Sequence, residues 1–123
     1  MDYISTTKAP AAIGPYSQAI TAGGFLYTSG QIPLVPETGR IEAEDIVGQT
    51  HQACKNLGAV LDEAGIGFAN VVKTVCYLAN MDDFAAFNEV YAQYFTGKPA
   101  RSCVAVKSLP KGALCEIECV AVH

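Results

Sequence analysis

The sequence predicts an α+β fold, in which a mixed β-sheet carries two helices on one of its faces. Two observations support this fold class. The patterned segments follow the order strand, strand, helix, strand, helix, strand, strand, which cannot build a regular alternating barrel. The chain has 123 residues, 50% of them hydrophobic, which suffices for one core but not for two large domains. We therefore expect residues 1–123 to form a single domain.

A short β-hairpin is expected first, from residues 17–21 and 25–29. Both runs are rich in apolar and β-branched residues, and the pair Gly23-Gly24 between them suits a tight turn. The next segment is predicted to be a loop, because it contains Pro33, Pro36 and Gly39.

A helix is expected from Glu42, where the apolar residues begin to recur at steps of three and four. Its first turn would be acidic, which the helix dipole favours, through Glu44 and Asp45. Gly65 suits the left-handed residue just past the helix end. The buried face would consist of Ile46, Thr50, Ala53, Leu57, Val60, Leu61 and Ala64.

The segment 71–79 is rich in β-branched residues and predicts a strand that crosses the centre of the sheet. A second helix should follow from Asp82, since aromatic residues repeat at helical spacing until Gly97 and Pro99 stop it. These aromatic residues are Phe84, Phe87, Tyr91 and Tyr94 or Phe95.

The last two strand-like runs, 101–106 and 114–122, are joined by a connection that suits a hairpin. Much of both faces of the run 114–122 is apolar, although two helices can cover only one face of the sheet. The simplest cover for the other face is another subunit.

Composition and charge exclude several classes of protein. No apolar run reaches the roughly 18 to 20 residues of a membrane span, and the N-terminus lacks the pattern of a signal peptide, so we expect a cytoplasmic protein. The net charge is −4 and the basic residues are scattered singly, which disfavours nucleic acid as a partner. The five cysteines contain no CxxC pair, so buried reduced thiols are favoured over a metal site or disulfides.

Reactive groups are few in this sequence. Its two histidines, His51 within a helix and His123 at the end, offer little basis for a Ser-His or Cys-His nucleophile. Neither a GxGxxG nor a GxxxxGKS motif occurs, which argues against dinucleotide and phosphate-loop sites.

Two charged residues stand in unusual surroundings. Arg101 begins an apolar strand, where it could bind a substrate carboxylate through two charge-assisted hydrogen bonds or simply be a solvated arginine. Glu116 lies in the last strand, where it could orient water and move a proton or merely face outward. Glu118 would share the face of Glu116, so position alone does not decide between these roles.

Three further positions could line a site. Cys103 lies two residues after Arg101, hence on the same side of the strand, and without a nearby base it is more often a packing residue than a nucleophile. Tyr16 follows the rigid pair Gly14-Pro15 and could stand at a pocket mouth or only pack there. Ser29-Gly30 could offer a hydroxyl and bare backbone to a ligand, although a plain turn explains this pair equally well.

Taken together, these residues resemble the RidA family, also called the YjgF family, of small reactive-intermediate deaminases. The resemblance covers nearly the whole chain in order and at similar intervals. Its matching stretches are APAAIGPYSQ at 9–18, YTSGQIP at 27–33, NVVKT at 70–74, DF at 83–84, NE at 88–89, PARS at 99–102 and EIE at 116–118.

The resemblance implies a chorismate-mutase-like α+β fold that forms a homotrimer with pockets between subunits. The implied activity is hydrolysis of 2-imino acids such as 2-iminobutanoate and 2-iminopropanoate to 2-keto acids and ammonia, without cofactor or metal. By motif, Arg101 would grip the substrate carboxylate and Glu116 would lie nearest the hydrolytic water. The pocket would be completed by Tyr16, Ser29, Gly30, Phe84, Asn88 and Cys103.

Two departures from the family pattern stand out: Cys115, where a branched aliphatic residue is usual, and the short connection 96–98, which ends in Lys98. The first should affect packing only, whereas the second could change the pocket rim and the substrate range. Two rival functions remain open. A noncatalytic sensor of small 2-keto acids would use Arg101 but not Glu116, and an endoribonuclease or translation inhibitor would conflict with the acidic charge balance.

Overall fold

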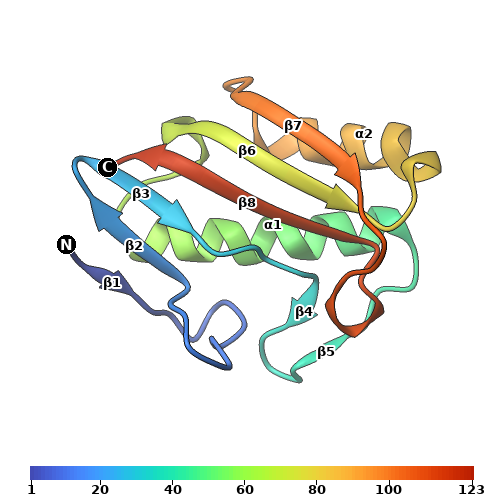
Figure 1. The fold of residues 1–123 in the computed structure, drawn as a ribbon, viewed down its shortest axis with the longest axis horizontal. Coiled ribbons are helices and arrows are strands. Elements are labelled where there is room, and N and C mark those ends of the chain that lie inside the picture. Colours follow the sequence, from blue (N-terminus) through green and yellow to red (C-terminus); the bar gives the residue numbers. More distant parts are fainter.

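The computed structural model describes residues 1–123 and contains one six-stranded sheet in the order β1-β2-β3-β8-β6-β7. Both helices lie behind this sheet in the view of Figure 1. The predicted mixed α+β fold is therefore confirmed. The sheet strands are β1 (Tyr3–Ile4), β2 (Ala19–Ala22), β3 (Phe25–Thr28), β6 (Val71–Leu78), β7 (Ala100–Ala105) and β8 (Cys115–Val122), and the helices are α1 (Ile46–Glu63) and α2 (Phe84–Tyr94).

The predicted first hairpin is formed by β2 and β3, which pair antiparallel. Its turn needs glycine, because Gly23 and Gly24 both have positive φ, 60° and 83°. The segment predicted as a loop contains a second, smaller hairpin of β4 (Leu34–Val35) and β5 (Arg40–Ile41). The side-chain amide of Asn56, on α1, donates to the Leu34 carbonyl at 2.9 Å and fixes this hairpin to the helix.

Helix α1 begins later than predicted. Asp45 has extended backbone and its carboxylate accepts from the Gly48 amide at 2.8 Å, so it is the N-cap, and Glu42 and Glu44 lie outside the helix. The predicted end is confirmed, since Gly65 has φ of 79°. The predicted face of the helix packs toward the sheet, and its residues are Ile46, Thr50, Ala53, Leu57, Val60, Leu61 and the less buried Ala64.

The predicted hairpin of the last two runs is wrong. Strand β7 pairs parallel with β6 at the edge of the sheet, whereas β8 lies between β3 and β6 and pairs antiparallel with both. Parallel neighbours are joined by a crossover helix, and α2 supplies it between β6 and β7. Strand β6 consequently lies next to the edge strand rather than at the centre, and the segment after β7 crosses over to place β8 inside the sheet (Figure 1).

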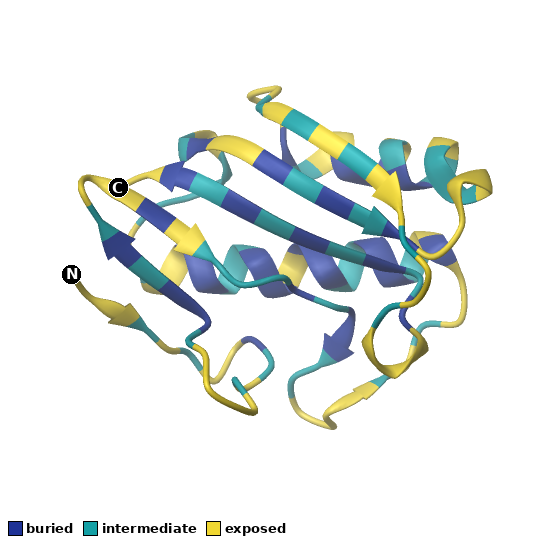
Figure 2. Cartoon of the chain, viewed as in Figure 1, coloured by how far each residue is buried: buried dark blue, intermediate teal, exposed yellow.

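The two faces of the sheet differ in burial, as the alternating colours of β8 in Figure 2 show. On the helix side, Ile117 and Cys119 are almost fully buried, and four of the five free cysteines are buried. On the other side, which we call the open face, Tyr27 and Val122 are 44% and 45% exposed. The open face thus leaves apolar side chains in solvent. Neither α1 nor α2 combines the length and apolarity of a membrane-crossing helix.

Candidate active site

Glu116 lies against the backbone at the end of β3. After Thr28 the chain steps through Ser29 and Gly30, and Gln31 then bridges Ile117 of β8 with N–O distances of 2.8 and 3.1 Å. The Glu116 side chain occupies the space that a Cβ of residue 30 would need, since such a Cβ would lie 2.7 Å from Glu116 Cδ. Glycine at position 30 is therefore required for this placement of the carboxylate.

The Glu116 carboxylate lines a cavity of about 610 Å³. Four of the predicted site residues line it together: Tyr16, Ser29, Gly30 and Glu116. The Ser29 hydroxyl donates to the Ser17 carbonyl at 2.6 Å, so it holds the wall in place. Other lining residues, which the sequence did not single out, include Gln18, Gln31, Lys111 and Glu118.

One wall of the cavity is the loop before β2, and Gln18 holds it. This side chain is only 3% exposed. Its amide donates to the Pro10 and Thr6 carbonyls at 2.8 and 3.1 Å, and its carbonyl oxygen accepts from the Thr6 amide at 2.7 Å. A glutamine buried among loop carbonyls has no periodic signature in the sequence, which is why its role was missed.

The electrostatics of the cavity favour Glu116 as a proton acceptor. Burial raises the pKa of Glu116, and the nearby carboxylate of Glu118 raises it further. Glu118 in turn accepts a hydrogen bond of 2.6 Å from the Tyr77 hydroxyl, and this bond is the main cause that raises the pKa of Tyr77 to about 12. Glu116 is therefore a stronger base than an exposed glutamate.

Arg101 is held in a different place, between β7 and α2. Its Nη1 donates to Asn88 Oδ1 at 2.7 Å, and its Cζ lies 5.4 Å from the centre of the Phe84 ring and 4.8 Å from that of Tyr91. The guanidinium thus packs against two aromatic rings, and its one hydrogen bond, to Asn88, leaves most of its N–H donors unused. Arg101 and Lys98 both line a second cavity, of about 460 Å³.

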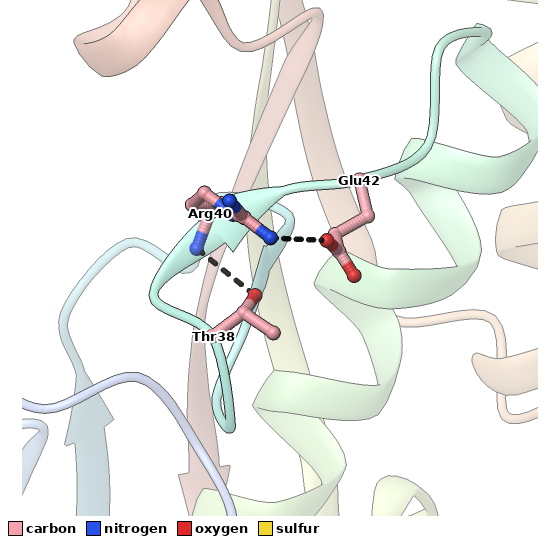
Figure 3. Close-up of polar contacts among 3 residues, drawn as sticks. All are labelled: Thr38, Arg40 and Glu42. Carbon is pink, nitrogen blue, oxygen red and sulfur yellow. Dashed lines mark hydrogen bonds and ion pairs between the residues drawn. The ribbon is translucent and has the colours of Figure 1, made fainter.

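No carboxylate neutralises Arg101. The ion pair in the structure joins Arg40 and Glu42 at 3.3 Å beside β5, where Thr38 also accepts from the Arg40 amide (Figure 3). Both partners of that pair are solvent-exposed, so it contributes little to stability. Arg101 is by contrast a half-buried, pre-oriented cation without a counter-ion, which is how an anion-binding arginine is prepared for its ligand.

Cys103 lies on the same face as Arg101, as predicted. Burial raises the pKa of the Cys103 thiol, although the charge of Arg101 lowers it in part. The thiol is therefore mainly protonated at neutral pH, and a protonated thiol is a poor nucleophile. This agrees with its interpretation as a packing residue.

The structure places Arg101 and Glu116 on opposite faces of one sheet. Arg101 lies beside Thr74, which pairs with Cys119, whereas Glu116 pairs with Tyr77. Since successive residues of a strand point to opposite faces, Arg101 shares the helix side and Glu116 the open face. Two groups result, which we call the Glu116 cavity and the Arg101 cradle; the cradle contains Phe84, Asn88, Tyr91, Arg101 and the nearby Cys103.

Comparison with known proteins identifies the family. The family model described as endoribonuclease L-PSP matches residues 6–123. The chain belongs to the RidA (YjgF) family. It is 52% identical to the 2-iminobutanoate/2-iminopropanoate deaminase of Mus musculus, over 98% of this chain and 90% of that protein.

Solved structures of RidA relatives agree with the fold. The YjgF gene product of E. coli superposes with a TM-score of 0.94 at 42% identity, over 100% of this chain and 99% of that one. E. coli TdcF, solved with bound serine, gives a TM-score of 0.95 at 41% identity over the same shares. The RidA match includes both the Glu116 cavity and the Arg101 cradle, because it extends from residue 6 to the end of the chain.

Proposed function

We propose that this chain hydrolyses 2-imino acids, such as 2-iminobutanoate and 2-iminopropanoate, to 2-keto acids and ammonia. The observation that carries the proposal is the Arg101 cradle, a pre-oriented cation with unused N–H donors and no protein carboxylate. The name of the mouse relative and the serine bound to TdcF support the same class of substrate, since serine also carries a carboxylate next to its nitrogen-bearing carbon.

Arg101 binds the substrate carboxylate in this proposal. The guanidinium packs against the Phe84 and Tyr91 rings, and its unused N–H donors can make two parallel N–H···O bonds to a carboxylate. A charge-assisted hydrogen bond contributes about 1.5 to 3 kcal/mol, which corresponds to roughly 10- to 150-fold in affinity. The bound carboxylate fixes the position of the imine carbon, which is the electrophile.

Glu116 acts on water. Its carboxylate accepts a proton from water as the oxygen attacks the imine carbon, which forms a C–O bond and converts the C=N bond to C–N. With the imine protonated, this addition gives a carbon that bears a hydroxyl and an amino group. Glu116 passes its proton to the amino nitrogen, the C–N bond breaks and ammonia leaves, and the hydroxyl proton returns to Glu116 as the C=O bond forms. Burial of Glu116, which raises its pKa, assists the first step because it makes the carboxylate more basic.

The two groups meet between copies of the chain in this proposal. Within one chain they lie on opposite faces of the sheet, so one site requires Arg101 from one protomer and Glu116 from its neighbour. The exposed apolar side chains of the open face, among them Tyr27 and Val122, support such an assembly. We propose a homotrimer, a closed ring with three sites. Each copy supplies Arg101 to the site that it shares with one neighbour and Glu116 to the site that it shares with the other.

Turnover is tested first with 2-iminobutanoate generated in the assay from threonine by a pyridoxal-phosphate dehydratase. The protein should accelerate release of 2-ketobutanoate above the spontaneous rate. Arg101→Ala should mainly raise KM, by about 10- to 150-fold, because the carboxylate is bound throughout the reaction. Glu116→Gln should mainly lower kcat, by about 100-fold or more.

Mixed assemblies of the two variants test where the site lies. If the variants are unfolded together in equal amounts and refolded, half of the chains keep Arg101 and half keep Glu116. A site shared between copies is then intact in about a quarter of cases, so about a quarter of the wild-type activity should return. A site built within one chain would stay inactive, because every chain lacks one of the two groups.

Two other functions would give different experimental results. A noncatalytic binder of 2-keto acids would bind 2-ketobutanoate through Arg101 but would not accelerate hydrolysis. The family description names an endoribonuclease, and RNA binding that weakens steeply with salt, together with RNA cleavage, would favour that activity. The net charge of −4 and scattered basic residues argue against it.

A further inference from the structure

The Arg101 cradle rests on a buried aromatic residue. Tyr91, on α2, is 8% exposed and lies with its ring under the Arg101 guanidinium, 4.8 Å from Cζ to the ring centre. This ring also stacks on Phe95 at 4.3 Å with an angle of 20° between the planes. Phe87 also stacks with Tyr91, at 5.8 Å. Arg101 therefore packs against a ring that two neighbouring aromatic side chains hold in place.

A hydrogen bond holds the hydroxyl end of the Tyr91 ring against strand β6. Its hydroxyl lies 2.8 Å from Oγ1 of Thr74, a residue of β6 that is fully buried. Thr74 is also the direct neighbour of Arg101 in the β6–β7 pair. One residue thus sits beside Arg101 in the sheet and holds the ring on which the Arg101 guanidinium lies.

We propose that Thr74 and Tyr91 are positioning residues for carboxylate binding, because the Thr74–Tyr91 hydrogen bond holds the Tyr91 ring in place and the Arg101 guanidinium packs against this ring. A guanidinium can make two parallel bonds to a carboxylate only when both lie in one plane. Asn88 fixes one nitrogen of Arg101, and the ring removes the remaining freedom of rotation about that contact.

This inference rests on the proposed function only in that Arg101 binds a carboxylate. It predicts that a shift of the ring weakens carboxylate binding without affecting the water-attack step, for which Glu116 is responsible. A purely structural role would instead lower the melting temperature and the fraction of active protein, and would leave KM unchanged.

The decisive variants alter the Thr74 hydroxyl or the Tyr91 ring. Thr74→Val has nearly the same shape but removes the partner of the Tyr91 hydroxyl, and we expect KM for 2-iminobutanoate to rise about 3- to 10-fold with kcat within twofold. Thr74→Ser keeps the hydroxyl and should restore KM to within twofold of the wild type. Tyr91→Leu removes the ring itself and should raise KM about 10-fold or more, if it folds.

A second tyrosine on the same helix is a matched control. The Tyr94 hydroxyl lies 2.8 Å from His51 Nδ1, a bond of the same length that does not involve Arg101. Tyr94→Phe should therefore leave KM and kcat within twofold. A rise in KM for Tyr94→Phe equal to that for Thr74→Val would overturn the proposal, because the effect would then follow from loosening α2.

Direct titration with 2-ketobutanoate by calorimetry separates the two proposals. If Arg101→Ala and Thr74→Val both weaken binding while Thr74→Ser does not, both proposals hold. If Arg101→Ala weakens binding but Thr74→Val does not, the positioning role is refuted and the proposed function stands. If Arg101→Ala leaves binding unchanged, Arg101 does not bind the carboxylate and the proposed function itself fails.

Discussion

Replacing Gly30 with alanine moves the Glu116 carboxylate while adding only one methyl group. The new Cβ would lie 2.7 Å from Glu116 Cδ and 3.0 Å from Cγ, whereas ordinary contacts are 3.4 Å or longer. The φ of Gly30 is not positive, so alanine introduces no backbone strain there. The methyl group and the carboxylate cannot occupy the same space, and the flexible glutamate side chain is the part that yields.

The size of the effect follows from these distances. Glu116 Cδ must retreat by at least about 0.7 Å, because Oε2 lies closer still to the new Cβ, and a misplacement near 1 Å in a catalytic group costs up to about 100-fold in rate. We therefore expect Gly30→Ala to lower kcat by about 10- to 100-fold, with KM changed much less because the Arg101 cradle is untouched. Stability should hold or rise slightly, since alanine reduces the freedom of the unfolded chain.

Steady-state turnover of 2-iminobutanoate and thermal unfolding measure these two quantities. Gly67→Ala is the matched control, because a Cβ at Gly67 would meet nothing within 4 Å and its φ is −140°. This control should keep wild-type kcat and KM. A Gly30→Ala protein that folds and turns over within twofold of the wild type would show that the position of the Glu116 carboxylate does not limit the reaction, and the water-attack mechanism would lose its base.

Three further predictions follow from the same geometry. Cys103→Ser should keep most activity, and complete loss in a folded assembly would instead indicate a covalent role for the thiol. Glu118→Gln removes the charge that, after burial, raises the pKa of Glu116, so the acidic limb of the kcat profile should move to lower pH; an unchanged limb would contradict this coupling. Sedimentation at micromolar concentration should give a mass near three times the 13.0 kDa of one chain, and a monomer would refute the shared site.

Local sequence patterns predicted the elements of this fold well. The Gly23-Gly24 turn, the β-branched run of β6 and the aromatic repeat of α2 each depend on neighbouring residues, and each is confirmed. The error at the start of α1 has a local cause too. The acidic residues suggest that Asp45 belongs to the first turn. Its carboxylate instead accepts from the Gly48 amide as the N-cap, so Ile46 is the first helical residue.

The pairing of β8 could not be predicted from local patterns. Strand β8 is the next strand after β7 in the chain, yet it lies between β3 and β6. Its helix-side residues are buried and need a neighbouring strand on both edges, whereas the more exposed residues of β7 suit an edge strand. For the same reason local patterns do not predict on which face of the sheet Arg101 lies relative to Glu116. That relation depends on registers with Thr74 and Tyr77, two residues of a third strand.

The Glu116 cavity contains a cation of its own, Lys111, and comparison with it explains why we propose Arg101 of a second copy as the carboxylate anchor. Lys111 is exposed and lies in a turn with φ of 57°, and nothing packs its ammonium into one orientation. A hydrated ammonium on a flexible chain loses more freedom on binding than a guanidinium already fixed by Asn88, Phe84 and Tyr91. An anchor of the second kind holds the imine carbon still relative to the base, which hydrolysis requires. The site is therefore best built where the fixed cation of one protomer faces the basic carboxylate of the next.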